Sequence, residues 1–232
     1  MLISYPTFAE RARALLDRIA ELCAECGREP SEVNLMAVTK THPLEAAEYA
    51  SRFGLACVGE NRVQEGVEKI RRADFPIRWE LIGHLQSNKA ALAAKYFARI
   101  QSVDRAKLIA RLDACLREDE PALPILLQVN TGEDEAKFGA SVAEAPRLLE
   151  AALAAGSLRV DGLMTIAPLA RDPEVARRAF ACLRELRDEL AARFGVALPE
   201  LSMGMTGDLP EAIREGSTCV RVGTALFGER PG

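Results

Sequence analysis

The chain has 232 residues, of which 49% are hydrophobic and 28% charged, and its formal net charge at pH 7 is only -4. This composition excludes a disordered chain and is typical of a globular protein with a sizeable core. Its 30 basic residues are scattered rather than gathered in a stripe, so the sequence indicates neither a nucleic-acid nor a membrane partner and favours a small-molecule ligand.

The first part of the chain predicts a helix over about residues 8–26 that has no strand of its own. The preceding residues contain no long apolar segment, which predicts neither a signal peptide nor a membrane span, and so a cytoplasmic protein. In such a compartment the six cysteines are expected as free thiols. The Cys23/Cys26 spacing lacks the second pair or the histidines of a zinc site, so we interpret it as incidental.

After this helix, short apolar runs alternate with amphipathic patterns. The predicted strands are Val33–Val38, Leu55–Gly59, Arg78–Gly83, Ala98–Val103, Pro124–Asn130, Leu158–Met164, Pro199–Met203 and Thr218–Val222. The predicted helices between them are Leu44–Phe53, Val63–Arg72, Asn88–Tyr96, Arg105–Arg117, Val142–Leu153, Pro173–Phe194 and Leu209–Glu215.

This alternation predicts an α/β protein, a (β/α)8 barrel of the TIM type with an extra N-terminal helix. A doubly wound open sheet is the structural alternative. Because no linker or repeat divides the chain, we expect one domain over residues 1–232, with the barrel at about 33–228. The leading helix would then lie on the N-terminal side of the barrel or on its flank.

Lys40 follows the first predicted strand, just before a sequence that turns the chain towards the next helix. Desolvation at the mouth of a buried strand lowers the pKa of an amine and makes it a nucleophile towards carbonyls. Lys40 therefore suggests an imine with an aldehyde cofactor. Taken alone, it is more simply interpreted as a solvated lysine at a strand end.

Two glycine-rich segments near the C-terminus, Leu201–Asp208 and Val220–Ala225, each read as a strand that runs into a turn of small residues. Glycines, hydroxyls and free backbone amides in such turns can hold a phosphate, although each turn alone could be an ordinary one. Because a closed barrel brings its first and last strands together, Lys40 should lie close to Arg221 and Gly223. The sequence thus predicts one site at the C-terminal ends of the strands.

Several motifs of the chain occur together in one known family. They are Ala37–Lys40, Gly59–Glu65, Ile82–Lys89, Ser202–Met205 and Arg221–Thr224. In these motifs, over essentially its whole length, the chain resembles the pyridoxal phosphate homeostasis proteins. The resemblance implies a barrel like the N-terminal domain of bacterial alanine racemase, with pyridoxal phosphate (PLP) held as an aldimine by Lys40. It also implies a monomer that takes part in intracellular vitamin B6 homeostasis, and we predict that the protein does so as a carrier or buffer.

The resemblance also implies which residues bind the cofactor. They are Lys40, Asn61, Ser202, Met203, Thr206, Gly207, Arg221, Gly223 and Thr224, with no metal. Among them Ser202, Thr206-Gly207 and Gly223-Thr224 should hold the phosphate, and Thr206 replaces a serine found in most relatives. Asn61 is interpreted first as the N-cap of the helix over Val63–Arg72.

The resemblance further implies that Arg221 faces the pyridine nitrogen of the cofactor. A guanidinium cannot accept a proton, leaves that nitrogen neutral and supports carbanion chemistry poorly. A structural salt bridge is the alternative for this arginine.

The sequence favours storage of the cofactor without turnover. Racemisation needs bases on both faces of the cofactor, and the tyrosines Tyr5, Tyr49 and Tyr96 precede the barrel or fall in helical runs. Lys89 and Lys137 follow strand ends and could assist imine exchange, but each is more simply a solvated lysine. Two alternatives stay open: an amino-acid racemase or related imine enzyme completed by another domain, and a protein that delivers PLP to apo-enzymes.

Overall fold

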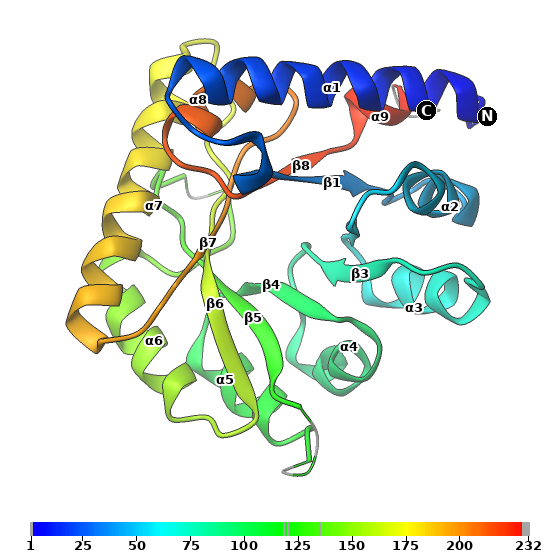
Figure 1. Cartoon of the computed structure of the whole chain (residues 1–232). Helices are drawn as coiled ribbons and strands as arrows, with labels where there is room; N and C mark the ends of the chain where they lie inside the picture. The colour runs from blue at the N-terminus through cyan, green and yellow to red at the C-terminus, as the bar shows by residue number, and fades with distance from the viewer. Residues whose placement is uncertain (1, 118, 120, 135, 229–232) are drawn as a thin grey trace.

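The structure is a computed structural model that describes residues 2–117, 119, 121–134 and 136–228. Eight parallel strands form one closed barrel in sequence order (Figure 1), which confirms the predicted TIM-type (β/α)8 fold and excludes the doubly wound sheet. The strands are β1 (Asn34–Val38), β2 (Cys57–Glu60), β3 (Arg78–Leu81), β4 (Arg99–Val103), β5 (Leu123–Gln128), β6 (Leu158–Met164), β7 (Glu200–Ser202) and β8 (Cys219–Val222).

Helices surround this barrel and connect successive strands (Figure 1). The α-helices are α1 (Tyr5–Glu25), α2 (Leu44–Phe53), α3 (Val63–Arg72), α4 (Ala90–Tyr96), α5 (Ala106–Asp113), α6 (Ala145–Leu153), α7 (Pro173–Phe194), α8 (Leu209–Arg214) and α9 (Thr224–Phe227). Short 3-10 helices are η1 (Pro30–Glu32), η2 (Ser87–Lys89) and η3 (Val142–Glu144). None of the helices in the described residues has the length and apolar composition required to cross a bilayer.

Local signals explain why α7 has the predicted bounds. The Asp172 side chain accepts a hydrogen bond from the Glu174 amide, and Pro173 occupies the first turn, where a proline needs no hydrogen-bond donor. Gly195 ends the helix in the left-handed conformation with φ 65°. The predicted range Pro173–Phe194 therefore agrees with the structure.

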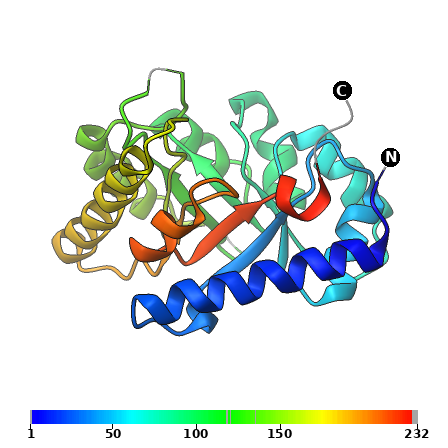
Figure 2. The same ribbon diagram turned by 90° about the horizontal axis from the view of Figure 1, so that it is seen from above.

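Helix α1 lies on the flank of the barrel, beside β8 and β1 (Figure 2), and contacts α2, α8 and α9. It begins three residues before the predicted start, because Ser4 accepts a hydrogen bond from the Thr7 amide and Pro6 fits the first turn. Its Phe8 ring stacks on Phe227 of α9 with ring centroids 5.2 Å apart. Of the two positions considered for this helix, the flank is the one observed.

Side-chain alternation decides which strand residues face the barrel interior. Met36, Val38, Cys57, Ile82 and Cys219 form a cluster made only of residues on or next to strands, separate from the core shared with the helices. Since successive side chains on a strand point to opposite faces, residues of the other parity pack outward against helices. This parity positions the functional side chains described below.

Candidate functional site

A cavity of about 370 Å³ lies at the C-terminal ends of the strands. Most of the predicted cofactor-binding residues line it, namely Lys40, Asn61, Thr206, Gly207, Arg221, Gly223 and Thr224. The charged residues among the described lining are Lys40, Lys137 and Arg221, with His42 and His84 beside them. The described part of this lining is therefore cationic, which favours an anionic ligand.

The backbone on both sides of Lys40 is held by hydrogen bonds to buried or partly buried side chains. Lys69 Nζ of α3 donates to the carbonyl oxygen of Thr39 at 2.8 Å. The amide of Thr41 donates to Glu65 Oε1 at 2.7 Å, and Thr41 has a positive φ of 65°, which is uncommon for a β-branched residue. These contacts fix the turn that carries Lys40, whose side chain is half-buried and lines the cavity.

A buried ion pair lies behind this turn. Lys69 Nζ is 2.7 Å from Glu60 Oε1 and 2.8 Å from Glu65 Oε1, and Thr39 Oγ1 donates to Glu60 Oε1 at 2.6 Å. Burial raises the pKa of Glu60 above its ordinary value, although the Lys69 ammonium opposes this. Partial burial acts in the same direction on Glu65, but the hydrogen bonds from Lys69 and from the Thr41 amide lower its pKa overall.

Sequence reasoning missed this pair. Glu60 and Glu65 lie in one of the family motifs, and Glu65 and Lys69 have the i, i+4 spacing of facing helix residues. The i, i+4 spacing of Glu65 and Lys69 was the sequence signal from which their pairing could have been predicted.

Arg221 lines the cavity and is only 4% exposed. Its Nη1 donates to Ser202 Oγ at 2.7 Å and its Nη2 to the carbonyl oxygen of Thr165 at 2.7 Å. No carboxylate of the described residues lies within 4.0 Å of this guanidinium, so the salt-bridge alternative is not observed there. Burial lowers the pKa of Arg221, but an arginine keeps its charge.

Two residues of the predicted set, Ser202 and Met203, do not line the cavity. Ser202 is fully buried and lies deeper in the barrel, where its hydroxyl donates to Gln101 Oε1 at 2.6 Å. Met203, next in sequence, has the opposite parity and packs in the core shared with the helices. The motif match identified the segment but not the direction of each side chain.

The interpretation of Asn61 as a helix N-cap was wrong. The N-cap of α3 is Arg62, and it makes no side-chain capping bond. Asn61 instead lines the cavity, and its backbone lies against Gly83, where a Cβ atom would be 2.2 Å from the Asn61 carbonyl oxygen. The Asn-to-Gln spacing resembled a capping box, but the helix begins one residue later than that motif requires.

The rim of the cavity contains an aromatic stack that the sequence did not predict. The ring of His84 stacks on Phe138 with centroids 4.0 Å apart, and His84 Nδ1 is 3.4 Å from Asp104 Oδ2. Lys137, next to Phe138, lines the same cavity. Lys89 lies in a neighbouring depression with Arg62 and Gln64.

Known proteins resemble this chain over most of its length. The family model for the alanine racemase N-terminal domain matches residues 11–231. A pyridoxal phosphate homeostasis protein from Aquifex aeolicus is 40% identical over 222 residues, which cover 95% of this chain and 97% of the relative. The chain belongs to the pyridoxal phosphate homeostasis protein family.

Solved structures extend this family comparison. PipY of Synechococcus elongatus without PLP is 38% identical, has a TM-score of 0.86, and the match covers 95% of this chain and 100% of PipY. PipY with PLP bound is 38% identical, with a TM-score of 0.79 over 90% of this chain and 100% of PipY. An alanine racemase of Clostridium difficile, 14% identical with a TM-score of 0.78, is matched over 96% of this chain and 58% of the racemase and shares the fold.

Proposed function

We propose that the chain acts as one PLP-binding domain that holds PLP in the cavity and serves vitamin B6 homeostasis as a carrier. The observation that carries the proposal is the convergence of Lys40, Arg221 and the turns at Thr206-Gly207 and Gly223-Thr224 on one cavity. The membership in a family whose PipY structure is described with PLP bound supports it.

The residues present fit this cofactor. Lys40 offers a half-buried amine, and Arg221 offers donors to an aromatic ring nitrogen. Thr206 and Thr224 are exposed hydroxyls, and the position of a Cβ atom at Gly207 has no atom within 4 Å, which leaves room for an anion. When bound, PLP supplies an aldehyde that condenses reversibly with amines and releases water.

The positions of the tyrosine side chains support storage of PLP rather than catalytic turnover. Tyr5 and Tyr49 pack against each other with centroids 5.4 Å apart, and the Tyr96 hydroxyl accepts hydrogen bonds from Arg71. The tyrosines thus lie away from the cavity, whereas the racemase mechanism needs a base on each face of the cofactor. We further propose that the protein acts as a monomer in the cytosol, where its six free thiols are stable.

Absorption spectroscopy tests the proposal directly. The purified protein is incubated with PLP, scanned, reduced with borohydride and digested for mass analysis. We expect a new visible band and a reduced adduct on the peptide that contains Lys40. Lys40→Ala should lose the adduct, whereas Lys95→Ala, at an exposed position on α4, should retain it. Absence of both the band and the adduct in the unchanged protein would contradict the proposal.

Delivery to apo-enzymes and turnover are tested separately. Transfer of PLP to an apo-transaminase faster than its spontaneous release would support delivery through a docked complex. A change in the optical rotation of alanine incubated with the loaded protein would instead favour a racemase. Retention of PLP unchanged by Lys137→Ala would fit storage without a relay through that lysine.

A further inference from the structure

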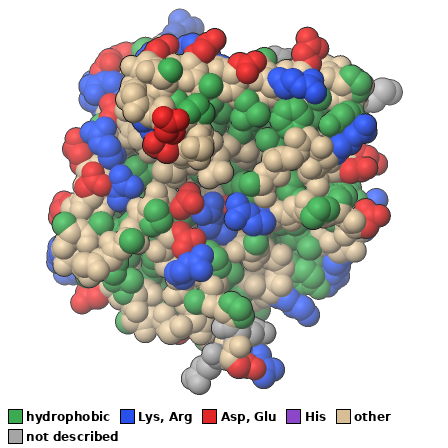
Figure 3. Space-filling model, viewed as in Figure 1, with side chains coloured by type: hydrophobic (Ala, Val, Ile, Leu, Met, Phe, Trp, Pro, Cys, Tyr) green, Lys and Arg blue, Asp and Glu red, His purple; other side chains and the backbone are tan. Residues whose placement is uncertain are grey.

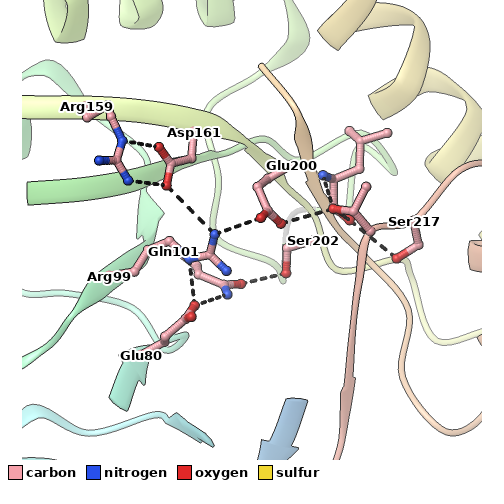
Figure 4. Close-up of polar contacts among 10 residues, drawn as sticks. Glu80, Arg99, Gln101, Arg159, Asp161, Glu200, Ser202 and Ser217 are labelled. Atoms are coloured by element: carbon pink, nitrogen blue, oxygen red, sulfur yellow. Dashed lines mark hydrogen bonds and ion pairs between the residues drawn. The ribbon is translucent and has the colours of Figure 1, made fainter. Parts of the chain in front are cut away.

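A row of polar side chains crosses the interior of the barrel and ends at Arg221. Arg99 Nε and Gln101 Nε2, both on β4, donate to Glu80 Oε2 of β3 at 2.7 Å each. Gln101 Oε1 accepts from Ser202 Oγ of β7 at 2.6 Å, and Ser202 Oγ accepts from Arg221 Nη1 of β8 at 2.7 Å. Figure 4 shows this row from Arg99 to Ser202.

The donors and acceptors in this row have only one consistent arrangement. A carboxylate only accepts, so the amino group of Gln101 faces Glu80 and its carbonyl oxygen faces Ser202. The hydroxyl of Ser202 has one hydrogen, which must go to that carbonyl oxygen. Its lone pair then accepts from Arg221, which has no acceptor of its own.

The row is rigid because it is buried and paired. Glu80 is 2% exposed, and Gln101 and Ser202 are fully buried. Arg99 also lies 3.3 Å from Glu200 and 3.9 Å from Asp161, so its guanidinium pairs with three carboxylates, of which Glu80 is the nearest at 2.7 Å (Figure 4). Breaking one bond in such a network leaves buried polar atoms without partners, which is costly.

The arrangement has two consequences for the site. The single hydrogen of Ser202 is used by Gln101, so this hydroxyl has none left to donate to a phosphate. The two terminal nitrogens of Arg221 are held from behind by Ser202 and by the Thr165 carbonyl, while the residue also lines the cavity. Its remaining N–H groups are the ones available to a ligand.

We propose that Gln101 and Ser202 are positioning residues that hold the Arg221 guanidinium towards the ring nitrogen of the bound cofactor, and that Ser202 is not a phosphate ligand. This inference rests on the proposed function, because it requires a pyridine ligand in the cavity. It gives Ser202 a different role from the one that the family motif implies.

Binding of two ligands that differ in one ring atom tests the inference. The dissociation constants of PLP and of 1-deaza-PLP, in which a C–H group replaces the ring nitrogen, are measured for the unchanged protein and for variants. We expect the unchanged protein to prefer PLP by about ten- to a hundredfold, the range of a hydrogen bond to a charged group. Ser202→Ala should reduce this preference several-fold and leave the affinity for 1-deaza-PLP nearly unchanged.

Thr224→Ala is the matched control, since Thr224 lies in the turn proposed to hold the phosphate. Thr224→Ala should weaken the binding of both ligands equally and leave the preference for PLP unchanged. If Ser202→Ala also weakens both ligands equally, Ser202 is a phosphate ligand and the inference is overturned.

Gln101→Leu provides a second test should Ser202→Ala fail to fold, and it is expected to reduce the preference in the same way. Failure of the unchanged protein to bind PLP would overturn the proposed function itself. Binding of PLP with a preference that neither variant alters would overturn only the role of Gln101 and Ser202.

Discussion

The ammonium of Lys69 donates a hydrogen bond of 2.8 Å to the backbone carbonyl of Thr39, the residue before Lys40. On the other side, the amide of Thr41 is bound by Glu65, which also pairs with Lys69. One ion pair therefore controls the two peptide groups that flank the candidate nucleophile. It also compensates the uncommon backbone conformation of Thr41, which would cost about 1–3 kcal/mol without support.

Replacement of Lys69 should strongly destabilise the folded protein. We expect Lys69→Met to lower the free energy of unfolding by about 3–5 kcal/mol, because it leaves Glu60 buried and without its counter-ion. Urea denaturation followed by circular dichroism measures this. Lys107→Met, at an exposed position on α5, should change the free energy of unfolding by no more than about 0.5 kcal/mol. Equal effects of the two changes would show that the buried pair is not important for stability.

The pH dependence of stability should report the raised pKa of Glu60. Between the ordinary value of 4.5 and the raised value, the folded protein binds more protons than the unfolded chain, so the contribution of Glu60 to stability falls as the pH rises. Glu60→Gln removes this contribution. The stability of Glu60→Gln relative to the unchanged protein should therefore increase with pH above about 4.5. Denaturation curves at several pH values measure it, and a relative stability that decreases with pH would mean that Lys69 lowers this pKa instead.

The contact between Gly83 and Asn61 leaves no room for a side chain. A methyl group at Gly83 would lie 2.2 Å from the Asn61 carbonyl oxygen, so Gly83→Ala must displace the backbone at the cavity. We expect a loss of stability of about 1–3 kcal/mol and weaker PLP binding. At Gly156, a methyl group would meet no atom within 4 Å, and Gly156→Ala should be neutral or slightly stabilising. Thermal unfolding measures the stability of both variants, and an unchanged stability of Gly83→Ala would contradict the close contact.

The cysteines should differ sharply in reactivity. Burial raises the pKa of Cys57, and it raises that of Cys219 to about 11, whereas Cys26 is exposed. Since the thiolate is the reactive form, iodoacetamide at about pH 7 should label Cys26 and leave Cys57 and Cys219 unmodified in the folded protein. Mass analysis of the digested protein measures this. All six should react after denaturation, and rapid labelling of Cys219 without denaturation would contradict the described barrel interior.

The fold could be predicted from the sequence because its signals are local. The apolar runs gave all eight strands, and the predicted bounds of α2, α3 and α7 agree with the structure. The site was predicted in part. Motifs identify segments, but the choice between Ser202 and Met203 depends on strand parity, which a motif does not contain.

Long-range partners are harder to predict. Gln101 and Ser202 are hydrogen-bonded although they lie 101 positions apart in the sequence, and no feature of the sequence near either residue indicates the other. Charged side chains of both signs are also interspersed over the surface (Figure 3). The presence of charged residues in the sequence therefore gave no indication of which of them form ion pairs inside the barrel. Closure of the barrel creates these contacts, so they follow from the fold rather than from a local pattern.

Helices α1 and α9, at opposite ends of the described residues, meet through Phe8 and Phe227, and this has a consequence for biosynthesis. Lys40 precedes Gly223 and Thr224 in the chain, so it leaves the ribosome well before them. A nascent polypeptide thus exposes the amine before the turns proposed to hold the phosphate exist and before β8 can pair with β1. The proposed loading with the vitamer therefore follows the translation of β8 and of the turn at Gly223-Thr224.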